Sequence, residues 1–144
     1  SMLNTGDQIP DLGLKSTEGK YLILFFYPKD NTPGCTLEAC SFRDHQSDFS
    51  DLNAVIVGVS KDSEKSHEKF VDKFNLPYEL IADEDLKLVN AFGVLKEKNM
   101  FGKKYMGIER STFLIDPNGK ILQSWRKVKV LGHTKEILEE LRNL

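Results

Sequence analysis

The sequence predicts an α/β fold in which helices flank a central mixed sheet, and three observations lead to this prediction. Residues 21–27 form a run of seven apolar or aromatic side chains, which is too short to cross a membrane and is typical of a strand buried on both faces. Residues 54–60 form a second run of this kind, rich in β-branched side chains. Such strands alternate along the chain with amphipathic helices, which is typical of a parallel sheet covered on both faces.

Composition sets limits on the class of protein. The chain has 144 residues, of which 40% are hydrophobic and 29% charged, and this suits one globular domain with a full core. We therefore expect a single domain over residues 2–144 and interpret Ser1 as an expression scar. A net charge of -2 gives no electrostatic reason to expect a nucleic acid or an anionic membrane as partner.

The two cysteines indicate redox chemistry rather than a structural disulfide scaffold. A chain of this size needs more than two cysteines for such a scaffold, and Cys35 and Cys40 lie close together in sequence. Closely spaced cysteines of this kind are typical of a reducing compartment. No signal peptide or transmembrane run is visible, so we expect a cytoplasmic protein.

The segment after the first strand predicts a loop followed by a helix. Pro28 has no N–H to give to a sheet ladder and ends the strand. Thr32 followed by Pro33 fits an N-cap with proline at the first helical position. We expect one continuous helix from here to about Ser50, with one face formed by Ala39, Phe42, Gln46 and Phe49.

Further elements follow in alternation. A helix is expected over residues 64–75, a third strand over 78–82, and a short helix after the acidic residues 83–85 that ends at Gly93. Residues 111–115 and 120–125 are expected to pair as a hairpin.

Three stretches near the end of the chain complete the prediction. Residues 95–109 show no periodicity, and we expect a long functional or mobile loop there that delivers Arg110 to the next strand. Residues 127–131 are expected to add a further extended piece. The final helix is expected to start near Thr134.

Cys35 is the strongest candidate for a nucleophile. It falls at about the third position of the predicted helix, where unpaired backbone N–H groups and the helix dipole favour a thiolate over a thiol. A zinc site formed by Cys35, Cys40 and His45 is disfavoured, because steps of five residues rotate around a helix rather than converge.

The residues around Cys35 resemble a known family. Pro28, Thr32 and Cys35 match the active-site pattern of the peroxiredoxins, Pro-x3-Thr-x2-Cys. The fuller run over residues 26–35, with Cys40 five residues on, resembles the bacterioferritin comigratory protein or peroxiredoxin Q branch. The resemblance covers nearly all of the chain after residue 20, with further similar segments at residues 66–70, 76–78, 103–113 and 132–133.

The resemblance implies a thioredoxin-like fold and a role for five residues. Cys35 would be the peroxidatic cysteine and Cys40 the resolving one. The hydroxyl of Thr32 would bond the cysteine sulfur and the peroxide, Pro28 would shield the thiolate from water, and Arg110 would support the thiolate electrostatically. No metal, haem or flavin cofactor is required.

The implied activity is a thiol-dependent peroxidase that reduces hydrogen peroxide and organic hydroperoxides. The Cys35 thiolate would become a sulfenic acid, Cys40 would condense with it, and a thioredoxin-type dithiol would reduce the disulfide. We expect a monomer or a weak homodimer. The sequence leaves open the preferred hydroperoxide and the physiological reductant.

The chain departs from the resemblance at two places. Residues 6–11 resemble the family's opening segment, which leads into an N-terminal hairpin, but residues 15–20 then run straight into the first strand. We expect a shortened N-terminal edge, and the sequence is compatible with a true deletion or with an omitted loop. Leu95 stands where members commonly have tryptophan after Phe-Gly-Val.

Other interpretations compete with these roles. Cys35 could be an inert buried thiol, although the start of a helix after a polar loop is a poor place to bury one. Thr32 could be only an N-cap, and Arg110 an ordinary surface arginine. His45, His67 and His133 are expected to be structural or exposed.

Two other functions remain open as well. A thiol-disulfide oxidoreductase typically has a Cys-x-x-Cys pair, whereas four residues separate Cys35 from Cys40. A non-enzymatic chaperone or binding module would use residues 100–106 as an adhesive surface.

Overall fold

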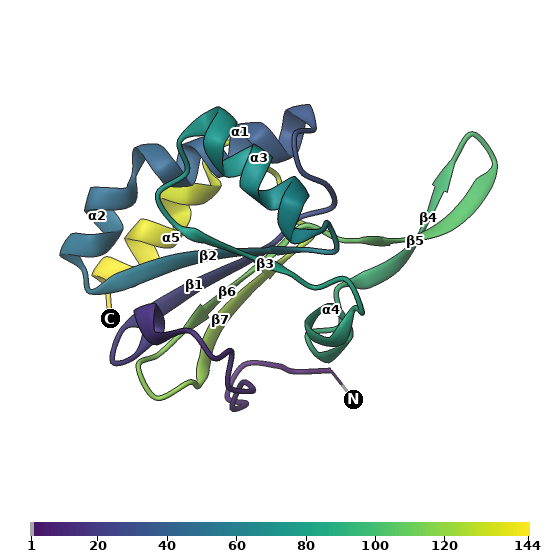
Figure 1. The fold of residues 1–144 in the computed structure, drawn as a ribbon. Coiled ribbons are helices and arrows are strands. Elements are labelled where there is room, and N and C mark those ends of the chain that lie inside the picture. Colours follow the sequence, from purple (N-terminus) through teal and green to yellow (C-terminus); the bar gives the residue numbers. More distant parts are fainter. Residues whose placement is uncertain (1) are drawn as a thin grey trace.

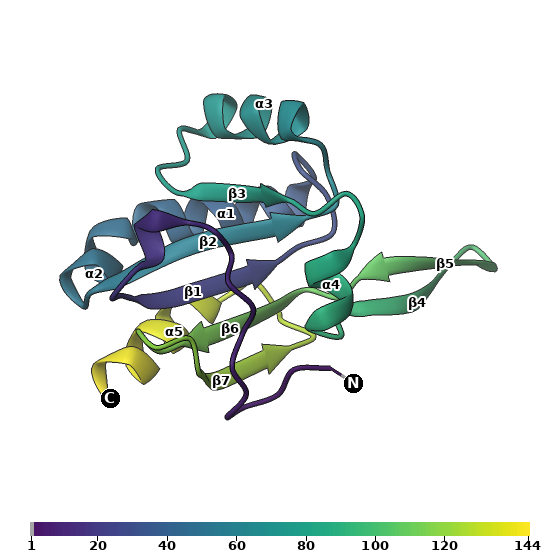
Figure 2. The ribbon, with the colours of Figure 1, turned by 60° about the horizontal axis from the view of Figure 1, so that its bottom comes forward.

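The protein is built on a five-stranded sheet with the order β3-β2-β1-β6-β7, seen in a computed structural model that describes residues 2–144 (Figures 1 and 2). β1, β2 and β3 are parallel, β6 is antiparallel to β1, and β7 is antiparallel to β6. The predicted mixed sheet is therefore confirmed, and its strands are β1 (Tyr21–Phe26), β2 (Ala54–Ser60), β3 (Glu79–Ala82), β6 (Ser111–Ile115) and β7 (Ile121–Arg126).

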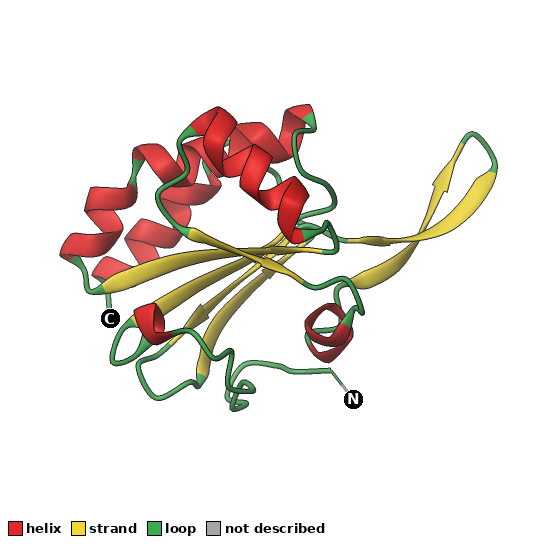
Figure 3. Cartoon of the chain, viewed as in Figure 1, coloured by secondary structure: helices red, strands yellow, loops and turns green. Residues whose placement is uncertain are grey.

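Four helices cover one face of this sheet, and a thinner layer with less secondary structure covers the other (Figures 1 and 3). The first layer consists of α1 (Pro33–Asp44), α2 (Gln46–Asp51), α3 (Glu64–Phe74) and α5 (His133–Arg142). The second consists of α4 (Lys87–Ala91) and the N-terminal segment with the short 3-10 helix η1 (Lys15–Thr17). Side chains of β1 alternate between the two core clusters, so the predicted burial of this strand on both faces is confirmed.

The predicted continuous helix is wrong at His45, where the structure divides it into α1 and α2. His45 has φ -106° and ψ 11°, outside the helical range. Its ring Nδ1 lies 2.8 Å from the carbonyl oxygen of Ser41, the acceptor that the backbone N–H of His45 would use in a continuous helix. That N–H instead bonds the carbonyl of Phe42 at 3.2 Å, and the chain changes direction.

The predicted long loop at residues 95–109 is also wrong. It forms an antiparallel hairpin of β4 (Leu95–Met100) and β5 (Lys103–Ile108) that projects from the body of the molecule (Figure 1). The two turn residues, Phe101 and Gly102, both have positive φ, which is the geometry of a tight hairpin turn. Most side chains of the hairpin are exposed or half-buried, and its exposed apolar side chains are Met100, Phe101, Tyr105 and Met106.

The extended piece expected at residues 127–131 is not a strand. Lys127 has φ 55°, a left-handed conformation that ends β7. One contact of this segment matters for the site, because the N–H of Val128 donates to the carbonyl of Arg110 at 2.9 Å.

The N-terminal segment, residues 2–20, contains no hairpin. Its ladder contact with the sheet is one isolated bridge between Gln8 and Lys120, and β1 begins at Tyr21 directly after the turn that follows η1. Among residues 2–144, no helix combines the length and the apolar character that a membrane crossing requires.

Candidate active site

Cys35 lies in the first turn of α1, just beyond the end of β1. Thr32 is the N-cap in an extended conformation and Pro33 is the first helical residue, so the predicted helix start is confirmed. The first helical hydrogen bond joins the N–H of Thr36 to the carbonyl of Thr32 at 2.8 Å. The N–H of Cys35 belongs to the opening turn, where the backbone donors have no acceptor within the helix.

The Cys35 side chain is buried, with 2% of its surface exposed, so the expectation that the start of a helix is a poor place to bury a thiol is wrong here. Cys35 belongs to the core cluster that also contains Phe25 and Tyr27, and Nη2 of Arg110 lies 3.3 Å from its Sγ. The register that pairs Phe26 with Ser111 places Arg110 at the same end of the sheet as Cys35. A side chain at Gly34 would crowd this contact, since a Cβ there would lie 3.3 Å from Nη2.

Glu38 completes the cluster, although its role is not predicted from the sequence. Its Oε1 accepts a hydrogen bond from Nη1 of Arg110 at 2.8 Å, so the guanidinium bridges a thiol and a carboxylate. Glu38 is 1% exposed, and its Oε2 has no hydrogen-bond partner within residues 2–144. Its spacing of three residues from Cys35 places both on one helix face, which is the signal that could have identified it.

The charges of this cluster depend on burial. Burial raises the pKa of Glu38 to about 7, while the neighbouring Arg110 opposes the shift. For Arg110 burial lowers the pKa, but the charges of Glu38 and Cys35 outweigh it and the pKa is raised. Arg110 therefore remains a cation beside the sulfur.

Thr32 and Pro28 lie on the loop between β1 and α1. The hydroxyl of Thr32 donates to the carbonyl of Lys29 at 2.8 Å and makes no capping bond to the helix. Its proton is thus committed to Lys29, and its oxygen lone pairs remain available as acceptors. Pro28 is half-buried directly after Tyr27.

Cys40 is half-buried on α1, and both cysteines are free thiols. Residues five apart on a helix are separated by roughly 7.5 Å along the axis and about 140° around it. A disulfide requires closer and converging side chains. Cys35 and Cys40 therefore cannot bond while α1 remains helical.

A buried polar network fixes the loop that precedes Cys35. Asp30 accepts hydrogen bonds from Tyr27 at 2.6 Å and Ser66 at 2.7 Å, and contacts Nδ1 of His67 at 2.7 Å. The other ring nitrogen of His67 lies 2.9 Å from the carbonyl of Ile81. Since both neighbours of the ring are acceptors, His67 is doubly protonated and forms a buried ion pair with Asp30.

The pKa shifts of this pair agree with that assignment. Burial opposes both charges, but hydrogen bonds from His67, Tyr27 and Ser66 lower the pKa of Asp30, and Asp30 raises the pKa of His67. Asp62 lies beside them and could complete a three-ligand metal cluster, yet it accepts from the Asp30 N–H and the Ser60 hydroxyl. We assign the network a structural role, as predicted for His67.

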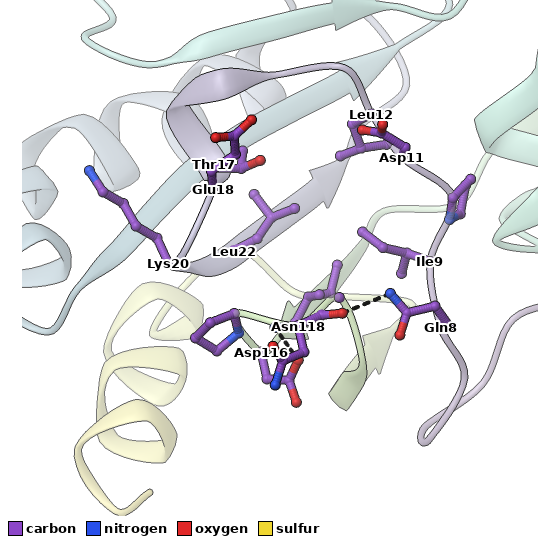
Figure 4. A pocket seen from close by; sticks show the side chains of 14 residues that line it. Gln8, Ile9, Asp11, Leu12, Thr17, Glu18, Lys20, Leu22, Asp116 and Asn118 are labelled. Atoms are coloured by element: carbon purple, nitrogen blue, oxygen red, sulfur yellow. Dashed lines mark hydrogen bonds between the residues drawn. The ribbon is translucent and has the colours of Figure 1, made fainter.

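A separate hollow lies at the end of β1 that is remote from Cys35 (Figure 4). The N-terminal segment, the start of β1 and the β6–β7 turn line it, and Gln8 donates to the carbonyl of Asn118 there at 2.8 Å. None of the predicted site residues lines it.

Comparisons with known proteins agree with this geometry. The sequence model of the AhpC/TSA family matches residues 3–124 of this chain. Peroxiredoxin Bcp of Bacillus subtilis is 51% identical over an alignment of 152 positions, which covers 99% of this chain and 97% of the relative. A putative peroxiredoxin Bcp of Coxiella burnetii is 53% identical over 130 residues, which cover 90% of this chain and 86% of the relative.

Solved structures show the same relationship. Peroxiredoxin Q of Xanthomonas campestris has a TM-score of 0.84 at 49% identity, covering 88% of this chain and 80% of that one. A cysteine-to-serine mutant of Xylella fastidiosa PrxQ has a TM-score of 0.91 at 40% identity, covering 99% and 98%. The expected thioredoxin-like fold is thereby confirmed, and this chain belongs to the AhpC/TSA family, within the Bcp or Q group of peroxiredoxins.

Proposed function

We propose that this enzyme reduces hydrogen peroxide and organic hydroperoxides with Cys35 as the peroxidatic cysteine and Cys40 as the resolving one. The observation that carries the proposal is the 3.3 Å contact between the guanidinium of Arg110 and the Cys35 sulfur at the start of α1. A structure of the Xanthomonas campestris relative, 48% identical to this chain, addresses alkyl peroxide reduction by that protein.

The first step is attack of the Cys35 thiolate on the terminal oxygen of the hydroperoxide. An S–O bond forms, the O–O bond breaks, and the leaving oxygen takes a proton to become water or an alcohol. The cysteine becomes a sulfenic acid, so the sulfur is oxidised and the peroxide is reduced.

An ionised thiol alone is not sufficient, because charge moves onto the leaving oxygen during attack. Arg110 and the backbone N–H of Cys35 supply donors for the peroxide oxygens. The Thr32 oxygen, with its own proton committed to Lys29, is suited to accept the O–H of the hydroperoxide. Pro28 limits the access of water to the thiolate.

The second step joins the two cysteines. The Cys40 sulfur attacks the sulfenic sulfur, an S–S bond forms, the S–O bond breaks and water leaves. A thioredoxin-type dithiol then reduces the disulfide, and the protein acts in the cytoplasm as a monomer or weak homodimer. The pair of closely spaced free thiols supports this part of the proposal.

The decisive variant is Cys35→Ser. A serine hydroxyl is not appreciably ionised at neutral pH, so peroxide consumption should be lost while the fold is retained. Stopped-flow measurement of peroxide decay tests this, with Cys40→Ser as the control that keeps one equivalent of consumption. Turnover near the wild-type level in Cys35→Ser would remove the central role of this residue.

A second assay separates the competing functions. Three activities of the purified protein are measured. The first is peroxide consumption with a thioredoxin system, the second is reduction of insulin disulfides, and the third is prevention of the aggregation of a client protein. The proposal expects activity in the first assay only. Insulin reduction without peroxide consumption would indicate a thiol-disulfide oxidoreductase instead.

A further inference from the structure

The two neighbours of Cys40 in α1 are each tied to another element of the fold. The hydroxyl of Tyr78 donates to the carbonyl of Ala39 at 2.6 Å, in a buried contact. The hydroxyls of Ser41 and Thr134 lie 2.8 Å apart. Tyr78 precedes β3 and Thr134 belongs to α5, so two separate elements hold α1 on either side of Cys40.

We propose that Tyr78 is a positioning residue for the resolution step, because its hydrogen bond to Ala39 holds α1 wound and so limits how often Cys40 reaches Cys35. The inference rests on the proposed function, in which Cys40 resolves the Cys35 sulfenic acid. The contact between Ser41 and Thr134 of α5 holds the same segment of α1 on the other side of Cys40.

The surroundings of Tyr78 suit a permanent donor. Its side chain is buried in the core cluster that also contains Phe25 of β1 and Phe42 of α1. Burial first, and then the charges of Glu38 and Cys40, raise the pKa of its hydroxyl far above its usual value, so the hydroxyl keeps its proton. A carbonyl has two lone pairs, so Ala39 can accept from Tyr78 in addition to its partner within the helix.

The bond acts at a branch point of the chemistry. Once Cys35 is a sulfenic acid, either the Cys40 sulfur displaces its oxygen as water and a disulfide forms, or a second hydroperoxide oxidises it to a sulfinic acid and leaves as water or alcohol. The first path requires α1 to unwind, whereas the second does not. An interaction that keeps α1 wound therefore slows resolution and increases the fraction of Cys35 that is overoxidised.

The test uses Tyr78→Phe, which removes the hydroxyl and keeps the ring. Reduced protein is mixed with one equivalent of hydrogen peroxide, quenched by acid and alkylation at intervals, and analysed by intact mass for sulfenic acid and disulfide. Resolution should accelerate about two- to tenfold, the range expected from one hydrogen bond. The first peroxide step should stay unchanged, and overoxidation at high peroxide should fall.

Tyr21→Phe is the matched control, because it makes the same chemical change in a half-buried side chain at the far end of β1. It should leave both rates unchanged. Ser41→Ala removes the second tie and should accelerate resolution in the same direction. A merely structural defect would slow the first step or leave resolution unchanged, so acceleration is specific to the proposal.

Amide exchange of the reduced proteins gives a readout that needs no peroxide. Exchange over residues 35–43 should rise in Tyr78→Phe and not in Tyr21→Phe. The proposal is overturned if exchange and resolution are both unchanged in Tyr78→Phe and Ser41→Ala. A wild-type protein that forms no Cys35–Cys40 disulfide would instead refute the proposed function, and the exchange result would show separately whether Tyr78 holds α1.

Discussion

At the scale of single residues, the site is organised by one cation between two groups that can carry negative charge. Arg110 reaches the Cys35 sulfur with one terminal nitrogen and Glu38 with the other. Only the planar fork of a guanidinium provides two such donors in fixed geometry, and a lysine provides a point charge. The carboxylate thus fixes the direction in which Arg110 presents its second nitrogen to the sulfur.

Arg110→Ala should slow the first peroxide step about 10²- to 10³-fold, because a donor to the reacting oxygens is lost as well as a charge beside the sulfur. Rates must be measured by stopped flow at a pH where Cys35 is fully ionised in both proteins. The rate of Arg110→Lys should lie between those of the wild type and Arg110→Ala, because the lysine keeps the positive charge but cannot bridge Cys35 and Glu38. Equal rates for the fully ionised wild type and Arg110→Ala would mean that Arg110 acts through ionisation alone.

Glu38 should make stability depend on pH. Its pKa is raised from 4.5 to about 7 on folding, so its contribution is fully present below pH 4.5 and is lost as pH rises through about 7. The loss should be on the order of 3 kcal/mol. Urea unfolding between pH 4.5 and 8 measures it, with Glu38→Gln as the reference in which this part of the pH dependence disappears. Parallel stability curves for the two proteins would show that Glu38 is already ionised at low pH.

At the scale of elements, α1 has two incompatible tasks. Its opening turn places Cys35 against Arg110, which requires a helix, yet joining Cys35 to Cys40 requires that helix to unwind. The sheet below it has no such conflict, because β1 is paired on both sides and buried. In the proposed cycle we therefore expect α1 to unwind while β1 stays in place.

Oxidation to the Cys35–Cys40 disulfide should raise amide exchange over residues 34–42 while β1 stays protected. Cys40→Ser should reduce one equivalent of peroxide and then stall or become overoxidised without an added thiol. Hydrogen exchange of both redox forms and mass spectrometry of peptides across the two cysteines measure these outcomes. A sulfenic acid resolved equally fast in Cys40→Ser would indicate a different resolving partner.

The loop between β1 and α1 depends on the Asp30 network. Asp30→Asn removes the charge opposite the buried His67 and should cost about 3 kcal/mol, because breaking a buried pair leaves an uncompensated charge. Peroxidase activity should fall as well, since the loop carries Thr32 to the start of the helix. Urea unfolding and stopped-flow assays test both effects. Asp44→Asn, at an exposed ion pair with Arg43, should change neither.

At the scale of the whole molecule, the parts of the fold that bury apolar residues could be predicted from the sequence. Strands β1 and β2 and the start of α1 follow from uninterrupted apolar runs and from Thr32 before Pro33. The β4–β5 hairpin could not, because neither face of most of it is covered and no alternation is imposed on its side chains. Its turn uses Phe101 and Gly102, supported by Asn99 accepting from the Gly102 N–H, rather than a common Asn-Gly pair.

The site was predictable to a similar degree. Cys35 and Thr32 are identified by local sequence, and the place of Arg110 by resemblance. Glu38 and Asp30 were missed because their importance arises only when the sheet brings Arg110 and His67 to them from elements far along the chain. For Glu38 the one local signal is its three-residue spacing from Cys35, and burial of a charged side chain by a distant element leaves no further trace in the sequence.

In the proposed mechanism, the pairing of β1 with β6 also determines when Cys35 becomes reactive towards peroxide during synthesis of the chain. Cys35 leaves the ribosome 75 residues before Arg110, which corresponds to about 4 to 15 s at the usual pace of translation. Until residues 111–115 dock beside β1, the nascent thiol lacks the guanidinium of Arg110, and we expect it to react as an ordinary cysteine. In the proposed mechanism, peroxide sensitivity is thus acquired only when the last third of the polypeptide folds, so Cys35 of an unfinished chain is spared rapid oxidation.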